Sequence, residues 1–184
     1  MTAVSQAYAL LKDIDLRSRT KALGLPQQVE VRRTWSGVGF RLGKVHLLSK
    51  LEEVDEILVS PEMTRVPSAL SWVKGIANIR GMLLPIMDLR DFIDGDAIQT
   101  GRKTRVILIK KGELVSGLLV DEVFGMRHFF EEERTEDVPD DGSENLKKYL
   151  QGAFRKGNVH WGIFDMDNLA EDPGFLQVAA RNAG

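Results

Sequence analysis

The sequence predicts a mainly β protein, because short apolar runs alternate with glycine-centred turns along most of its 184 residues. Residues 38–42 and 45–47 alternate apolar and other side chains on either side of Gly43-Lys44, which predicts a hairpin with one buried face. Apolar runs flank residues 111–113 and 155–158 in the same way. Short strands and glycine turns at this density indicate small barrels or a sandwich.

The first 34 residues read differently from the rest. Apolar residues recur at helical spacing, so a helix is expected over residues 3–23, ended by Gly24 and Pro26. The apolar positions are Val4, Ala7, Leu10, Leu11 and Ile14. Such a helix either packs on the rest of the domain or serves as an extra docking arm, and the sequence leaves both open.

The middle of the chain predicts three further elements. Residues 53–59 read as a strand. Ser68 is expected to cap a short helical segment that runs through Trp72 and ends at Gly75. Residues 83–89 are apolar enough for a strand buried on both faces, in which Pro85 indicates an edge or a bulge. Large apolar residues usually lie inside, so Trp72 and its neighbour Val73 are expected in the core.

The last third carries an acidic stretch and a helix start. Residues 131–142 hold many carboxylates and few apolar side chains, which favours a solvated loop over a site for a cation or basic partner. Asp172 followed by Pro173 is typical of a helix N-terminus, so a C-terminal helix is expected over residues 173–184.

Composition limits the function. Lys and Arg number 25 against 27 Asp and Glu, so the chain lacks the overall positive charge expected of a nucleic-acid binder. There is no cysteine, which excludes thiolate catalysis, disulfides and cysteine-bound metal. No apolar run approaches the roughly 20 residues of a membrane span, and no secretory signal is visible, so a cytoplasmic protein is expected.

Motifs with known chemistry are missing. The histidines His46, His128 and His160 are isolated in sequence, and neither an EF-hand nor a zinc spacing occurs. A phosphate-binding loop and a nucleophile elbow are also absent. We therefore expect no catalytic residue, no metal and no cofactor.

Residues 72–89 are the most informative segment, because they place an Arg80-Gly81 turn between two apolar runs. An arginine at a sharp bend, in a chain without catalytic motifs, indicates a binding determinant. The segment predicts an adaptor.

The order of these segments resembles the CheW-like family of chemotaxis coupling proteins, from about residue 38 to residue 169. The family's most specific signature is nearly complete in residues 75–81 and 84–89. Weaker matches are residues 54–57, 66–67, 118–123 and 150–152. Residues 1–35, which end in Trp35, are similar to the extension of coupling proteins from the type IV pilus twitching-motility pathway.

The resemblance implies two five-stranded SH3-like barrels that share a hydrophobic interface, without catalytic activity. It divides the chain into a helical extension (1–34), the CheW-like domain (35–172) and the C-terminal helix (173–184). It also implies a scaffold that joins the signalling tip of a methyl-accepting chemoreceptor to the regulatory domain of a CheA-type histidine kinase. The membrane would then be reached only through the receptor.

Carried over residue by residue, the resemblance assigns partner binding to Arg80 and Glu56. A guanidinium at a turn can make bidentate contacts to carboxylates on a partner. An internal ion pair of Arg80 with Glu56 or Asp88 is the alternative, and the two can coexist. Gly75 and Gly81 are expected to supply turn conformations that other residues resist. We also expect four apolar residues near the partner surfaces: Ile57, Leu58, Val59 and Ile79.

Two other function classes remain as alternatives. A small-barrel nucleic-acid binder would use the basic residues Arg102, Lys103, Arg105, Lys110 and Lys111. A hydrolase would need a cleft that holds perturbed carboxylates such as Asp88 and Asp165.

Overall fold

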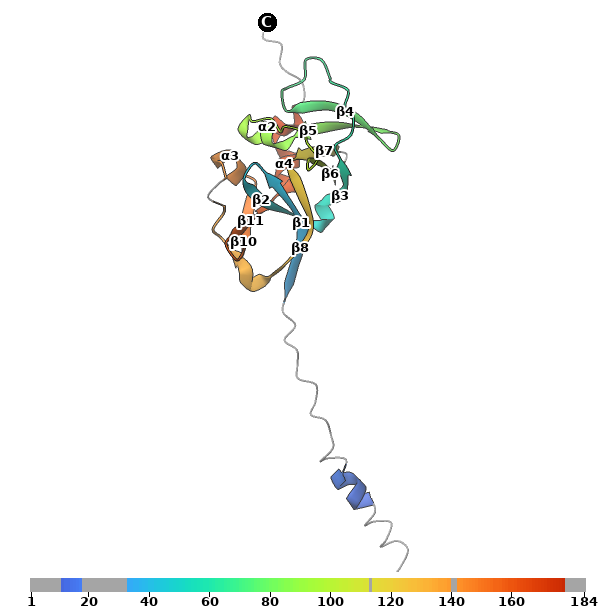
Figure 1. Ribbon diagram of the computed structural model, residues 1–184, viewed down its shortest axis with the longest axis vertical. Helices are drawn as coiled ribbons and strands as arrows, with labels where there is room; N and C mark the ends of the chain where they lie inside the picture. The colour runs from blue at the N-terminus through green and yellow to red at the C-terminus, as the bar shows by residue number, and fades with distance from the viewer. Residues whose placement is uncertain (1–10, 18–32, 113, 140–141, 178–184) are drawn as a thin grey trace, which may run out of the picture. The chain divides into compact units, whose positions relative to one another are not determined.

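The structure is a computed structural model that describes residues 11–17, 33–112, 114–139 and 142–177 (Figure 1). The chain divides into two compact units, residues 1–32 and 33–184. In the first unit residues 11–17 are helical, and Arg17 pairs with Asp13 one turn earlier at an N–O distance of 2.6 Å. The rest of the helix expected over residues 3–23 lies outside the described residues.

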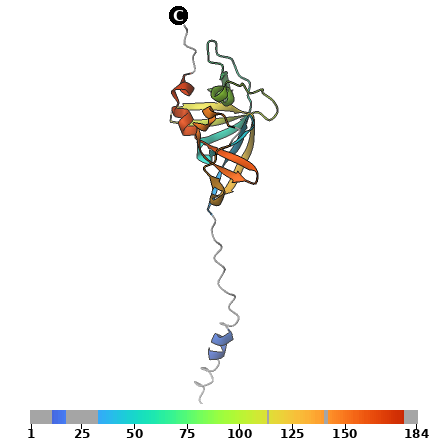
Figure 2. The ribbon, with the colours of Figure 1, turned by 90° about the vertical axis from the view of Figure 1, so that its left-hand side faces the viewer.

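The second unit is built from two β-sheets (Figures 1 and 2). Sheet A has the strand order β8-β1-β2-β11-β10-β9, and sheet B has the order β3-β6-β7-β5-β4. The strands of sheet A are β1 (Thr34–Leu42), β2 (Val45–Lys50), β8 (Glu122–Phe130), β9 (Arg134–Thr135), β10 (Leu150–Lys156) and β11 (Val159–Phe164). Those of sheet B are β3 (Val54–Val59), β4 (Val73–Ile79), β5 (Met82–Asp88), β6 (Arg105–Lys111) and β7 (Leu114–Val120).

The two sheets use the chain in different ways. Sheet B comes from the continuous segment 54–120, whereas sheet A joins segments from both sides of it. Strand β2, which pairs with β1 on one side, pairs in parallel with β11 on the other, and Leu47 lies opposite Gly162. The expected mainly β, two-barrel architecture is therefore confirmed, with one addition, since the two-residue β9 gives sheet A a sixth strand.

One large hydrophobic core joins the sheets. It contains Phe40, Leu47 and Phe164 from sheet A together with Ile86 and Ile107 from sheet B. A smaller cluster lies within sheet A and contains Leu48, Phe129, Phe154, Trp161 and Ile163. Burial of this apolar surface is the main stabilising contribution. The shared interface expected between the two halves is thus present.

Short helices complete the fold. They are η1 (Leu51–Glu53), α2 (Leu89–Asp94), η2 (Glu131–Glu133), α3 (Glu144–Lys147), α4 (Met166–Glu171) and α5 (Pro173–Leu176). The expected helix start is confirmed, because the Asp172 side chain accepts a hydrogen bond from Gly174 N–H at the beginning of α5. The helix expected through residue 184 is shorter than predicted, because α5 ends at Leu176 with Gln177 as its C-cap; residues 178–184 lie outside the described residues. Figure 2 shows the C-terminal helices in red along one flank of the unit.

Most predicted strands are confirmed, but the middle segment needs correction. The hairpins β1–β2, β6–β7 and β10–β11 form as expected, and β3 covers the predicted third strand. The helix expected from Ser68 through Trp72 is wrong: these residues form turns, because Ser68 takes a left-handed conformation with φ 59°. Trp72 and Val73 are buried, as expected.

Strand β5 follows the prediction only in part, because Leu83 is 71% exposed and the strand is buried on both faces only in its later residues. Pro85 pairs only with Ile76 of β4, and pairing with β7 begins at the next residue, Ile86. The proline therefore lies on a stretch of β5 that has no partner on the β7 side, although β5 as a whole lies between β7 and β4 and is not an edge strand. Leu89, expected as the last strand residue, begins α2 instead. The described part of the acidic segment, residues 131–139, is mostly exposed.

Candidate partner-binding surface

Arg80 occupies an unusual backbone conformation. It forms with Gly81 the two-residue connection between β4 and β5, in which Ile79 pairs with Met82. Both turn residues have positive φ, 54° for Arg80 and 88° for Gly81, the pattern of a type I′ hairpin turn. Asn78 supports the turn by accepting the Gly81 N–H at 2.9 Å. A residue with a Cβ at positive φ is strained, and such strain concentrates at functional sites.

The Arg80 guanidinium donates to Glu56 Oε1 at 2.6 Å. Glu56 belongs to β3 and Arg80 follows β4, which are opposite edges of sheet B, so this pair joins the two edges of a curled sheet. The Arg80 side chain is 75% exposed and that of Glu56 27%. An ion pair this exposed contributes at most about 1 kcal/mol to folding. The internal pair is therefore present, and the exposed guanidinium also faces solvent.

The four apolar residues expected near partner surfaces divide into two groups. Ile57 and Val59 point outward from β3, and Val59 is 71% exposed. Leu58 is half-buried and packs against the large core. Ile79 is 6% exposed and belongs to that core, so its role in a docking surface is not supported by its position. The period of β3 explains why Leu58 differs from Ile57 and Val59, because successive strand residues face opposite sides.

Further exposed apolar residues lie on the β4–β5 hairpin, which the sequence indicated as a surface through Arg80 and Ile79 but not through these residues. They are Ile76, Met82 and Leu83. Ile76 and Leu83 line a pocket of about 620 Å³ together with residues 61–64 and Asn78. Ile76 also lines a second, more apolar pocket of about 240 Å³ with residues 66–69, Val73 and Pro85. In the sequence of β4, the period of two places Ile76 on the same face as the polar residues Lys74 and Asn78, and this is the signal that could have revealed the groove.

Gly75 shapes the groove, although it lies within β4 and not in the turn expected from the sequence. Thr64 pairs with Ile76 through two backbone hydrogen bonds of 2.8 Å, which brings the chain against β4. A Cβ on Gly75 would lie 2.4 Å from the Thr64 carbonyl oxygen, and its φ is +148°. Only glycine fits this close approach.

We expect Gly75→Ala to lower the free energy of unfolding by about 1–3 kcal/mol, through backbone strain and overpacking. Urea denaturation measures the change. Gly81→Ala is the matched control: its φ is also positive, but nothing lies within 4 Å of the added Cβ, so only strain acts. Equal costs for the two variants would contradict the close approach of Thr64.

The described charges do not assemble a hydrolytic centre. Asp88 is fully buried and pairs with Lys74 at 3.0 Å. It accepts the Asp91 N–H in the first turn of α2 and the Ile98 N–H beyond the end of that helix. Asp165 caps α4 in the same way, by accepting Asn168 N–H at 3.0 Å. Both candidate carboxylates are therefore helix caps.

The basic residues of the nucleic-acid alternative are partly paired, Lys103 with Glu122 and Lys111 with Asp167. That alternative is not favoured.

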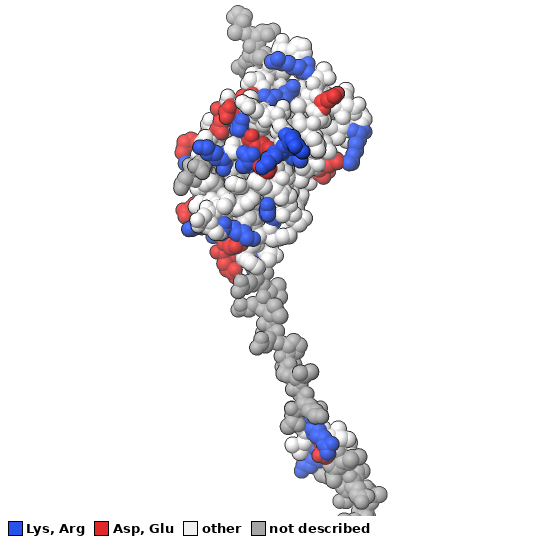
Figure 3. Space-filling view, in the orientation of Figure 1, with Lys and Arg blue, Asp and Glu red and all other residues white. Residues whose placement is uncertain are grey.

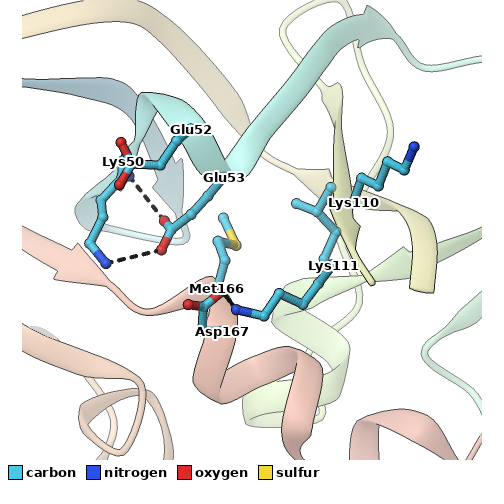
Figure 4. Close-up of a pocket in the computed structure, with 8 residues that line it drawn as sticks. Lys50, Glu52, Glu53, Lys110, Lys111, Met166 and Asp167 are labelled. Atoms are coloured by element: carbon cyan, nitrogen blue, oxygen red, sulfur yellow. Dashed lines mark hydrogen bonds and ion pairs between the residues drawn. The ribbon is translucent and has the colours of Figure 1, made fainter. Parts of the chain in front are cut away.

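One group of carboxylates could geometrically hold a cation. Single oxygens of Glu53, Asp165 and Asp167 lie within 4.8 Å of one another. Glu53 and Asp167 also line a pocket of about 200 Å³ between the sheets (Figure 4). Two of the three carboxylates already pair with ammonium groups: Lys50 lies 3.4 Å from Glu53, and Lys111 lies 2.6 Å from Asp167. Asp165 accepts the Asn168 N–H instead. Among the described residues the cluster is thus an ion-pair network.

The visible face of the unit carries interspersed positive and negative side chains rather than a single basic field (Figure 3).

Comparison with known proteins decides the family. A model of the CheW-like domain matches residues 36–174. The chain belongs to the CheW-like family. The resemblance noted in the sequence is confirmed, and the Arg80 turn lies within the matched segment.

Individual relatives agree with this assignment. The chain is 40% identical to Protein PilI of Pseudomonas aeruginosa over 97% of its own length and 99% of that protein. It is 33% identical to Protein FrzA of Myxococcus xanthus over 78% of its length and 86% of that protein. The scaffolding protein TtCheW of Thermoanaerobacter tengcongensis has a similar crystal structure, with a TM-score of 0.65 and 20% identity over 77% of this chain and 96% of that one.

The PilI match covers more of this chain than the FrzA match and the family model do. Because it covers 97% of this CheW-like chain, it includes most of the segment before β1, which the family model does not reach. In the described part of the chain, no helix is long and apolar enough to cross a membrane.

Proposed function

We propose that this protein is a non-catalytic cytoplasmic adaptor that couples a methyl-accepting chemoreceptor to a CheA-type histidine kinase. It acts by holding both partners at once, and it reaches the membrane only through the receptor. Membership of the CheW-like family supports this proposal. The observation that carries it is the strained, exposed Arg80 beside an apolar groove, in a chain whose candidate acids serve as helix caps.

The surface has the composition of a protein-docking site. Exposed Ile57 and Val59 on β3, and Ile76, Met82 and Leu83 on the β4–β5 hairpin, supply apolar contacts. Arg80 and Glu56 supply charge between these two strands. Buried apolar anchors ringed by polar groups are the usual anatomy of such interfaces. We assign the kinase regulatory domain to this surface, and a helical receptor tip to a helix-in-groove contact.

We further propose that the pathway controls type IV pilus twitching motility. The extension before β1 supports this narrower assignment, because the PilI match runs through it while the FrzA match covers 78% of the chain. Within this proposal the chain consists of the helical extension (1–34), the CheW-like domain (35–172) and the C-terminal helix (173–184). Nucleic acid is not among its partners.

Reconstitution from purified components tests the adaptor. The full chain is mixed with the regulatory domain of the kinase and with the signalling hairpin of the receptor, and complexes are separated by size-exclusion chromatography with light scattering. We expect a ternary complex of the chain, the kinase domain and the receptor hairpin. The two partners should not form a complex with each other when the chain is left out. Binding of neither partner, or turnover of a small-molecule substrate by the purified chain, would overturn the proposal.

A further inference from the structure

A group of rings surrounds His46 in sheet A, away from the Arg80 surface. The His46 imidazole stacks on Phe124 with ring centroids 5.3 Å apart and 19° between the planes. Trp161 presents an edge-on contact to His46 at 4.9 Å and to Phe124 at 5.5 Å. The three rings belong to β2, β8 and β11, so their contacts tie three strands of sheet A together.

The charges around these rings are mostly positive. Arg41 lies opposite His46 in the β1–β2 register. The Arg127 guanidinium from β8 lies over Phe124 and Trp161, 5.7 and 5.6 Å from their centroids. Lys44 and His160 line the same pocket as His46. Glu122 is the opposing carboxylate among the described groups near His46, and it already pairs with Arg41 at 3.3 Å and Lys103 at 3.0 Å.

A proton on His46 is therefore unfavourable in the folded protein. Burial lowers the pKa of His46 below 6.5, Arg41 and Arg127 lower it further, and Glu122 opposes them. Between the folded and unfolded pKa values the unfolded chain binds more protons than the folded one. The contribution of neutral His46 is thus complete above about pH 6.5 and is lost as the pH falls through the folded pKa.

We propose that His46, Phe124 and Trp161 form a pH-sensitive contact that holds β2, β8 and β11 together while His46 is neutral and loosens when it is protonated. A cationic imidazole would add charge beside Arg41 and Arg127. Strand β8 is the element most open to this change, because the β1–β8 register shifts between Gly39 and Phe40, beside a Gly125 with φ 76°.

Nuclear magnetic resonance of the full chain between about pH 8 and about pH 5 tests the proposal, since histidine titrates in this range. The readouts are the His46 ring shift, the Trp161 indole N–H shift, and amide exchange in β8 corrected for its intrinsic pH dependence. We expect His46 to titrate below 6.5. The Trp161 signal should move with the same midpoint, and protection in β8 should fall severalfold below it.

Variants assign the response to His46. His46→Phe keeps an aromatic ring that cannot be protonated, so the Trp161 and β8 responses should disappear, whereas His160→Phe should retain them. Arg41→Gln removes a neighbouring cation and should raise the His46 midpoint, which keeps the proposal testable if His46→Phe does not fold. A His46 midpoint at or above 6.5, a Trp161 response that persists in His46→Phe, or an unchanged midpoint in Arg41→Gln would each overturn it.

Discussion

Arg80→Glu is expected to weaken the complex with at least one partner by roughly 30- to 1000-fold, equivalent to about 2–4 kcal/mol. The reversal places a carboxylate opposite the position where a partner carboxylate is expected, and beside the existing negative charge of Glu56. The fold should persist, because both side chains are partly solvated and the pair contributes at most about 1 kcal/mol. Isothermal titration calorimetry against the kinase domain and the receptor hairpin measures the effect.

A charge-swapped variant separates the two roles of the arginine. In Glu56→Arg/Arg80→Glu the internal ion pair can form again, but the exposed charge on the turn stays reversed. Restored binding would mean that Arg80 acts only by joining the edges of sheet B. Binding that stays weak in the swap would mean that the guanidinium itself contacts the partner.

Arg155→Glu is the matched control for this series, because Arg155 is an exposed arginine on β10 of sheet A. We expect it to bind both partners as the unmodified chain does. If folded Arg80→Glu also binds both partners with unchanged affinity, the assignment of Arg80 to the docking surface fails. The adaptor function would then rest on the apolar groove alone, which Leu83→Glu tests in the same titration.

The sequence predicted the strands well and the short helices poorly, for a physical reason. Alternating apolar residues and glycine turns identify β1–β2, β6–β7 and β10–β11, because strand period and turn chemistry are local properties. The helices α2 and α4 span six residues each, too few to show a helical period. Their signals were the capping residues Asp88 and Asp165, which the hydrolase alternative instead treated as possible acids.

The candidate site was predicted in part. The Arg80–Glu56 contact was among the alternatives, but no local pattern shows that β3 and β4 become opposite edges of one curled sheet. Ile79 was expected at the surface and is buried, because the turn register places it on the inner face. Gly75 was expected in a turn, whereas its conformation serves a backbone approach by Thr64, which only the tertiary structure reveals.

Phe164→Ala is expected to lower the free energy of unfolding by about 3–5 kcal/mol. The ring is fully buried, packs edge-on against Phe40 at 6.0 Å and stacks with Tyr149 at 5.8 Å. It belongs to the core that joins sheet A to sheet B. Domains of this size have only about 5–15 kcal/mol of stability, so the variant should be close to its limit at room temperature.

The shared core predicts a second effect of Phe164→Ala. If Phe164, on β11 of sheet A, stabilises both halves at once, its loss must weaken strands β6 and β7 of sheet B as much as β10 and β11. Native-state hydrogen exchange resolves the two sheets, and Phe130→Ala is the control, since that ring is 39% exposed and should cost less than about 1 kcal/mol. Sheet B that keeps its protection while sheet A loses it would show two independent domains. Equal loss in both sheets would show one cooperative unit, in which sheet A stabilises the sheet that carries the Arg80 turn and β3.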